Sequence, residues 1–231
     1  MKYVIKKKVN KGFKSIHNFI LKFGIDVSFV KKEDTISAIQ HNSLLNTDNL
    51  YQSEDYLNDV TSREHQKFFM VLIALLKKNN IDLNGKAVAD VGCGVGNLLA
   101  HVGQSYALTG SYGFDFSQAA IDYAKRRGIP ADFLHHDIYE SMGRSFDFIF
   151  CTEVLEHLLY PGKALLNLVS AIKPGGGLLI TVPDGRKDTY SGHINFWSPE
   201  SWQIFIQEGT EGLKVTTGNI SGRNLYALIS R

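Results

Sequence analysis

The sequence has 231 residues, of which 44% are hydrophobic and 21% charged, and a formal net charge of +2 at pH 7. This composition is typical of a globular protein with one domain and an extension. No apolar run reaches the roughly 18 residues that a membrane-spanning helix needs, and no secretory leader is evident. The two cysteines, Cys93 and Cys151, fit a pair of free thiols. We therefore expect a cytoplasmic protein without a transmembrane segment.

Residues 1–60 are expected to form a basic helical extension. Nine lysines and a single acid, Asp26, occur in the first 32 residues, and apolar residues recur there at helical spacing (Phe13, Ile16, Ile20 and Phe23). Three interpretations stay open: a helix packed on its own domain or on a second subunit of a homodimer, a basic lid over an acidic or phosphorylated substrate, or a helix on a membrane surface. The rest of the chain has no basic-aromatic stripe, so nucleic acid is not an expected partner.

A polar segment over residues 33–59 is expected to cap a ligand cleft. Within it, Tyr51 and Tyr56 are candidates for stacking on a substrate or closing over a cofactor, and ordinary packing is the simpler interpretation of both rings. The apolar spacing after Ser62 predicts a helix over 62–78 that packs on a sheet.

A glycine loop follows the first predicted strand. The sequence from Val88 to Asn97 contains an acid at the strand end, Asp90, and then glycines at 92, 94 and 96. This spacing departs from the Gly-x-Gly-x-x-Gly of dinucleotide sites, and the Gly-Lys-Ser/Thr of a phosphate-binding loop is absent. Because Asp90 would repel a pyrophosphate, the loop favours a ligand with a cationic or hydrogen-bond-donating group. A tight turn without a ligand is the alternative.

Acidic residues also follow the next strands. A strand over 108–115 ends at Asp115, where a carboxylate can accept both ribose hydroxyls. Strands over 131–136 and 146–152 are followed by Asp137 and Glu153, and Asp137 is well placed for an adenine amino group. Helices are predicted over 118–127, with Ser117 as N-cap, and over 163–172. A strand over 178–182 follows, and residues 213–230 predict an antiparallel hairpin.

From about residue 83 onward the chain resembles the class I S-adenosylmethionine-dependent methyltransferases. Five motifs carry the resemblance, in order and at the family's usual spacing; they begin at Asp90, Gly113, His136, Phe146 and Leu168. The resemblance implies a Rossmann-like, mostly parallel seven-stranded sheet over residues 61–231, with an antiparallel C-terminal hairpin and helices on both faces. S-adenosylmethionine would be the cofactor and S-adenosylhomocysteine the product. The implied cofactor-binding residues are Asp90, Gly92, Gly94, Gly96, Asp115, Phe116, Asp137, Ile138, Thr152 and Glu153.

The segment over 183–199 is expected to form part of the substrate wall. It is too long for a plain connection and carries His193, Asn195 and Trp197. Its Gly-His-Ile-Asn-Phe-Trp-Ser-Pro-Glu run is similar to that of bacterial methyltransferases acting on small metabolites and sugars. A base that removes a hydroxyl proton must titrate near neutrality, so His193 is the first candidate and His157 the second. A structural role is the alternative for both.

A divalent metal at Glu153, Glu156 and His157 is a weaker alternative, by resemblance to ubiquinone-pathway O-methyltransferases with a similar Glu-x-x-Glu-His. We expect methyl transfer to a small molecule, most simply at a hydroxyl of a sugar, a nucleotide-linked or phosphorylated sugar or a related metabolite. Two alternatives stay open: N-methylation of a small amine, and a non-catalytic cofactor-binding partner subunit.

Overall fold

The computed structural model describes residues 42–231, and all of them lie in one compact unit that spans 37–231. The basic helix predicted around residues 13–23 lies outside the described residues. Helices α3 (Leu44–Tyr51) and α4 (Glu54–Val60) precede α5 (Arg63–Lys78), and α3 packs on α7 (Gln118–Arg126). The boundary expected at residue 60 stays a prediction.

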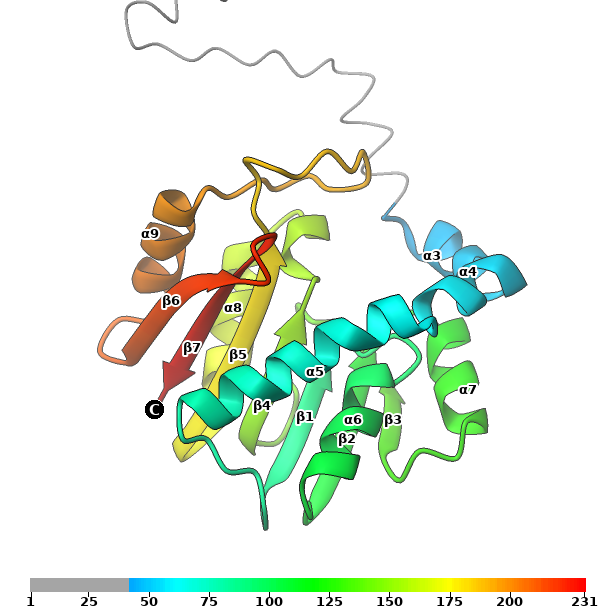
Figure 1. The fold of residues 1–231 in the computed structure, drawn as a ribbon, viewed down its shortest axis with the longest axis horizontal. Coiled ribbons are helices and arrows are strands. Elements are labelled where there is room, and N and C mark those ends of the chain that lie inside the picture. The colour runs from blue at the N-terminus through cyan, green and yellow to red at the C-terminus, as the bar shows by residue number, and fades with distance from the viewer. Residues whose placement is uncertain (1–41) are drawn as a thin grey trace, which may run out of the picture. The chain divides into compact units, whose positions relative to one another are not determined.

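A seven-stranded sheet forms the centre, in the order β3-β2-β1-β4-β5-β7-β6 (Figure 1). Its strands are β1 (Ala87–Val91), β2 (Gly110–Asp115), β3 (Asp132–His135), β4 (Phe146–Thr152), β5 (Ile172–Pro183), β6 (Lys214–Ile220) and β7 (Asn224–Ser230). Strands β1 to β5 pair in parallel, whereas β7 is antiparallel to both β5 and β6. The expected sheet and C-terminal hairpin are confirmed.

Alternate residues of the central strands face two apolar layers. Val88 and Leu179 pack with α5, α6 (Asn97–Ser105) and α7, while Ala89 and Ile180 pack with α8 (Pro161–Ser170) and α9 (Pro199–Gly209). A parallel strand covered on both faces is apolar almost throughout, which explains runs such as Phe-Ile-Phe-Cys in β4. The helices thus leave the carboxyl ends of the strands as the place for a ligand.

Most of the helices begin directly after a serine that caps their first turn. Ser53, Ser62, Ser117 and Ser198 each accept a hydrogen bond from a backbone N–H in the first turn of α4, α5, α7 and α9. Helices α6 and α8 have no such side-chain cap, and the N-cap of α6 is Gly96 at φ 79°. Glycine tolerates this left-handed conformation. The turn at Gly96 places the start of α6 directly under the glycine loop.

Candidate functional site: the carboxyl edge of the sheet

The strand order reverses between β1 and β4, because the chain proceeds outward from β1 in one direction and then continues from β4 in the other. Open α/β sheets bind ligands outside the carboxyl ends of strands at such a point. The glycine loop follows β1, and a short 3₁₀ turn, η1 (Leu155–His157), follows β4. The two halves of a site therefore lie on either side of this reversal, which we call the cofactor edge and the acceptor edge.

The glycine loop is held by the neighbouring strand. Gly92 and Gly94 have φ values of 80° and 50°, and the Gly92 N–H donates to the Phe114 carbonyl at 2.7 Å. The Gly94 N–H donates to Asp115 Oδ2 at 2.8 Å. A Cβ on Gly92 would lie 2.2 Å from Val154 Cγ2, so the loop has no space for a side chain there. Because its central N–H is used by Asp115, this loop is unlike a phosphate cradle.

Two carboxyl groups are buried at the cofactor edge. Asp90 is 2% exposed, and within the described residues its Oδ1 has no hydrogen-bond partner. Burial, and secondarily Asp115, raises the pKa of Asp90 from 3.8 to about 8. Burial also raises the pKa of Asp115, against the N–H groups of Ser117 and Gly94 that favour its charged form. A cation or a hydrogen-bond donor from a ligand would relieve both groups.

The other predicted cofactor residues lie along the same edge. Phe116, directly after β2, is 39% exposed, and Thr152 ends β4. Asp137 is exposed and its Oδ1 accepts from the Tyr139 N–H at 2.9 Å, while Ile138 packs against the core. The roles of these four residues in binding the cofactor stay predictions.

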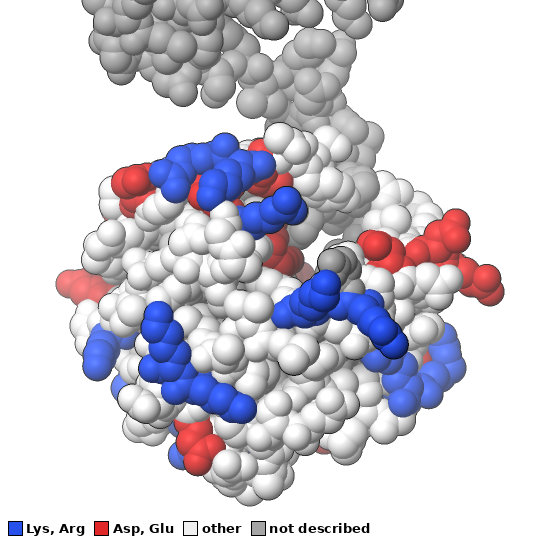
Figure 2. Space-filling model, in the orientation of Figure 1, with Lys and Arg blue, Asp and Glu red and all other residues white. Residues whose placement is uncertain are grey.

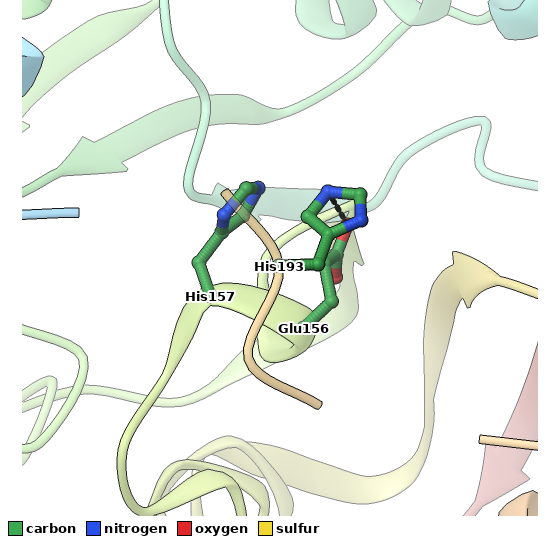
Figure 3. Close-up of side chains that lie close together, drawn as sticks. All are labelled: Glu156, His157 and His193. Atoms are coloured by element: carbon green, nitrogen blue, oxygen red, sulfur yellow. Dashed lines mark ion pairs between the residues drawn. The ribbon is translucent and has the colours of Figure 1, made fainter. Parts of the chain in front are cut away.

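Glu153 faces the acceptor edge. It has a positive φ of 56°, and its carboxylate accepts from Thr181 Oγ1 at 2.9 Å and from Asn224 Nδ2 at 2.8 Å. Burial raises its pKa from 4.5 to about 7. Of the three residues predicted as a weaker metal alternative, Glu156 and His157 converge with His193, and the ligand atoms of these three lie within 4.8 Å of one another (Figure 3). A metal role for Glu153 stays a prediction.

His193 lies between two acids. Its Nδ1 is 2.5 Å from Asp188 Oδ2, and its Nε2 is 4.0 Å from Glu156 Oε1. Both Glu156 oxygens are buried without a hydrogen-bond partner in the described part of the chain. Burial, and then Glu153, raises the pKa of Glu156 well above its usual value. The imidazole is thus oriented on one side and faces an unsatisfied carboxyl group on the other.

His157 is bound from the start of the described chain. Asn42 Oδ1 lies 3.0 Å from His157 Nδ1, and Asn42 Nδ2 donates to the Gly192 carbonyl at 2.7 Å. The two imidazole rings meet edge to face, with centroids 4.6 Å apart. The structure therefore brings together both predicted candidate bases.

Two predicted substrate residues have structural contacts instead. Asn195 Nδ2 donates to the carbonyls of Leu155 and Leu158, at 3.1 and 2.7 Å, and so fastens the 184–198 loop to η1. Trp197 packs against Trp202 and Phe205, with centroids 5.5 and 5.1 Å away. The anchoring amide and the α9 packing are tertiary contacts that the loop sequence does not reveal, and the substrate-facing role of these two side chains stays a prediction.

Sequence reasoning missed Asp188, Asn42 and Asp48. Asp188 could have been found, because it lies five residues before His193 in the same loop. Asn42 and Asp48 carry no such signal: Asp48 Oδ1 accepts from Ser117 Oγ at 2.5 Å, across 69 residues of sequence. Tyr51, by contrast, was noted but lies beside Gly94 at the cofactor edge rather than at the acceptor edge.

Comparisons with known proteins agree with this geometry. A family described as "Methyltransferase domain" matches residues 62–208. The "Ubiquinone biosynthesis O-methyltransferase" of Rickettsia prowazekii is 27% identical over 170 residues, which are 68% of each chain. That of Coxiella burnetii is 34% identical over 110 residues, 45% of this chain and 46% of the relative, so the chain spans about half the length of some relatives.

Solved structures share the fold. A DhpI complex with S-adenosylhomocysteine superposes with a TM-score of 0.64 at 18% identity, covering 82% of this chain and 97% of that one. Magnesium protoporphyrin IX methyltransferase from Synechocystis PCC 6803, also with S-adenosylhomocysteine, gives 0.61 at 17% identity, covering 85% and 99%.

The fold and the acidic glycine-loop edge define a class I cofactor-binding methyltransferase architecture. The chain belongs to the methyltransferase-domain family and is an S-adenosylmethionine-dependent methyltransferase, with that molecule as its cofactor. Across residues 42–231, no helix is both long and apolar enough to cross a membrane.

Proposed function

We propose that the protein methylates a hydroxyl oxygen of a small-molecule acceptor, with His193 as the general base. The observation that carries this proposal is the His193 imidazole, held by Asp188 and facing Glu156 at the acceptor edge. A carboxylate on Nδ1 orients the ring and stabilises its protonated form. The names of the relatives, which are O-methyltransferases, support methylation at oxygen.

The distance between His193 and Glu156 suits an oxygen atom. Two atoms 4.0 Å apart can both lie about 2.8 Å from one hydroxyl oxygen placed to the side of the line between them. As the oxygen bonds to the methyl carbon and the carbon–sulfur bond breaks, the hydroxyl proton passes to His193 Nε2. Holding the acceptor oxygen, the methyl carbon and the sulfur in line provides the remaining rate enhancement.

We propose a neutral acceptor group, such as a sugar or another metabolite hydroxyl. Three carboxyl groups, on Glu153, Glu156 and Asp188, lie close enough to influence one another. Burial already disfavours the charged forms of Glu153 and Glu156, so a phosphate near the reacting oxygen would place a further negative charge where charge is poorly tolerated. A phosphorylated sugar would therefore need its phosphate remote from the methylated hydroxyl.

The test is methyl transfer from isotopically labelled S-adenosylmethionine to panels of sugars, nucleotide-linked sugars, phenols and small amines, with products identified by mass spectrometry. We expect labelled ethers from neutral alcohols or phenols. Exclusive methylation of amines would replace this proposal with N-methylation. Tight cofactor binding without transfer to any acceptor class would favour a non-catalytic partner subunit.

A metal-assisted reaction is a second candidate, favoured by the unsatisfied carboxyl of Glu156 beside two imidazoles. These ligand types suit Zn²⁺ and other divalent transition ions. Ligands about 2.1 Å from a tetrahedral ion lie about 3.4 Å apart, so His193 and Glu156 would approach each other by about 0.6 Å. A bound ion would lower the pKa of an acceptor hydroxyl.

Metal content and activity separate the two candidates. The purified protein is analysed for bound metals, then assayed after chelation and after addition of Mg²⁺ or Zn²⁺. Activity that survives chelation supports the base proposal. Activity that is lost on chelation and restored by one ion, with Glu156→Gln reducing metal content, supports the metal.

A further inference from the structure

The helices α3 and α4, which we call the α3–α4 cap (residues 44–60), are fastened over the cofactor edge. Asp48 Oδ1 accepts from Ser117 Oγ at 2.5 Å and from the Ala119 N–H at 3.2 Å. At the other end, Asn97 Nδ2 donates to the Val60 carbonyl at 2.8 Å. Both anchors belong to the elements that follow the glycine loop and Asp115, so the cap is positioned by the cofactor edge itself.

Tyr51, the last residue of α3, reaches the glycine loop from this cap. A Cβ on Gly94 would lie 2.8 Å from the Tyr51 hydroxyl oxygen and 3.6 Å from Cζ, so the phenol end lies against the loop backbone. Tyr56 packs edge to face on Tyr51, with centroids 5.3 Å apart. Burial, and then Asp115, raises the pKa of Tyr51 well above 10.0, so its hydroxyl stays protonated. The two tyrosine side chains also share a hydrogen bond, and when Tyr56 is its donor the Tyr51 proton is left for a ligand.

The cofactor brings a requirement that the acids of this edge cannot meet. S-adenosylmethionine carries a sulfonium and an ammonium, which suit Asp90, and ribose hydroxyls, which suit Asp115, but also an α-carboxylate, which needs donors. The Gly94 N–H is bound to Asp115, and Asn97 Nδ2 to Val60. Arg127 Nη1 is bound to the Val95 carbonyl and to Asn97 Oδ1, each at 2.6 Å.

Helix α4 has no basic side chain that could serve as an alternative donor. Its first turn carries Glu54 and Asp55, and Figure 2 shows acidic side chains gathered over this segment. The Tyr51 hydroxyl is the donor of the cap that lies against the glycine loop.

We propose that Tyr51 is a cofactor-binding residue, whose hydroxyl donates a hydrogen bond to the α-carboxylate of S-adenosylmethionine when the α3–α4 cap lies over the glycine loop. Of the two ligand contacts that the sequence left open for Tyr51, with substrate or with cofactor, this proposal takes the cofactor. It concerns the cofactor alone and does not depend on the identity of the acceptor.

Calorimetry with two ligands tests the proposal. S-adenosylhomocysteine has the α-carboxylate, whereas 5′-methylthioadenosine keeps the adenosine and sulfur and lacks the amino-acid end. A hydrogen bond to a charged group contributes about 1.5–3 kcal/mol, or about 10- to 100-fold in affinity. We expect Tyr51→Phe to weaken S-adenosylhomocysteine by about that factor and to leave 5′-methylthioadenosine within about twofold.

The second ligand also detects an indirect effect. If Tyr51→Phe merely loosened the cap, both ligands would weaken together, and that result would overturn the proposal, as would unchanged affinity for S-adenosylhomocysteine. Tyr160→Phe is the matched control: Tyr160 is 65% exposed and precedes α8, on the other side of the strand-order reversal. It should leave both affinities unchanged.

Discussion

The cofactor edge and the acceptor edge are built in different ways. At the cofactor edge, one continuous stretch from Asp90 to Asn97 supplies the loop, and its partner Asp115 follows within 21 residues of Gly94. The acceptor edge is assembled from distant segments: Asn42 binds His157 across 115 residues, and Asn224 binds Glu153 across 71. A contiguous motif fixes cofactor chemistry, whereas acceptor chemistry depends on tertiary contacts.

The sharpest test of this division replaces His193. We expect His193→Ala to lower kcat by about 10² to 10⁴, because a general base contributes that much, while the affinity for S-adenosylhomocysteine stays within about twofold. His65→Ala, an exposed histidine on α5, is the control. Kinetics and calorimetry measure the two quantities. A large residual rate would indicate an acceptor that needs no base.

Asp90→Asn tests the cofactor edge through pH. Folded Asp90 keeps its proton up to about pH 8, whereas the unfolded chain releases it near 3.8. The folded state therefore binds more protons between these values, and the free energy of unfolding falls as pH rises. The Asp90→Asn variant lacks this pH-dependent loss of stability and should be more stable than the native protein by up to about 5 kcal/mol at pH 8.

Near pH 4 the Asp90→Asn variant and the native protein should have similar stability. Denaturant unfolding of the ligand-free proteins at pH 4.5 and 8 measures the difference. Parallel stability curves across this range would contradict the prediction. The variant should also bind the cofactor more weakly, since the carboxylate is the partner of a cationic ligand.

Gly92→Ala and Gly85→Ala together separate the cost of steric crowding from the cost of an unfavourable backbone conformation. Alanine at 92 adds a Cβ 2.2 Å from Val154 Cγ2 at a φ of 80°, so we expect a loss of about 2–3 kcal/mol. Gly85→Ala is the matched control: its φ is 70°, nothing lies within 4 Å of its added Cβ, and it should cost about 1 kcal/mol. Equal losses in denaturant unfolding would show that Val154 moves aside easily.

Asn195→Ala gives the smallest expected effect. Loss of its bonds to the Leu155 and Leu158 carbonyls should lower stability by about 1–2 kcal/mol and raise KM through the loosened loop. Thermal unfolding and acceptor kinetics measure both. Unchanged stability with a raised KM would instead restore the direct substrate role that the sequence suggested.

Most of the fold and the cofactor edge could be predicted from the sequence. The strand-glycine-helix pattern at 88–97, the acid at 115 and the hairpin at 213–230 are local signals, because alternation and turn chemistry act within a few residues. The predicted strand over 178–182 was shorter than β5, which begins at Ile172: Ile172 pairs with β4, and Gly177 pairs with both β4 and β7.

The acceptor edge could be predicted only in part. His193 and His157 were selected as titratable groups, but the position of Glu153 depends on its positive φ and on Thr181 and Asn224, which come from other strands. The internal contacts of Asn195 and Trp197 were not predicted, for a similar reason. A polar or aromatic side chain in a loop has the same sequence signature whether it contacts a ligand or fastens the loop.

The side-chain amide of Asn42 has one further consequence. Its nitrogen donates to the Gly192 carbonyl, so its oxygen must be the atom that faces His157 Nδ1. An amide oxygen only accepts, which selects the imidazole tautomer with the hydrogen on Nδ1 and the lone pair on Nε2. A residue 115 positions upstream thus determines which nitrogen of His157 can take up a proton.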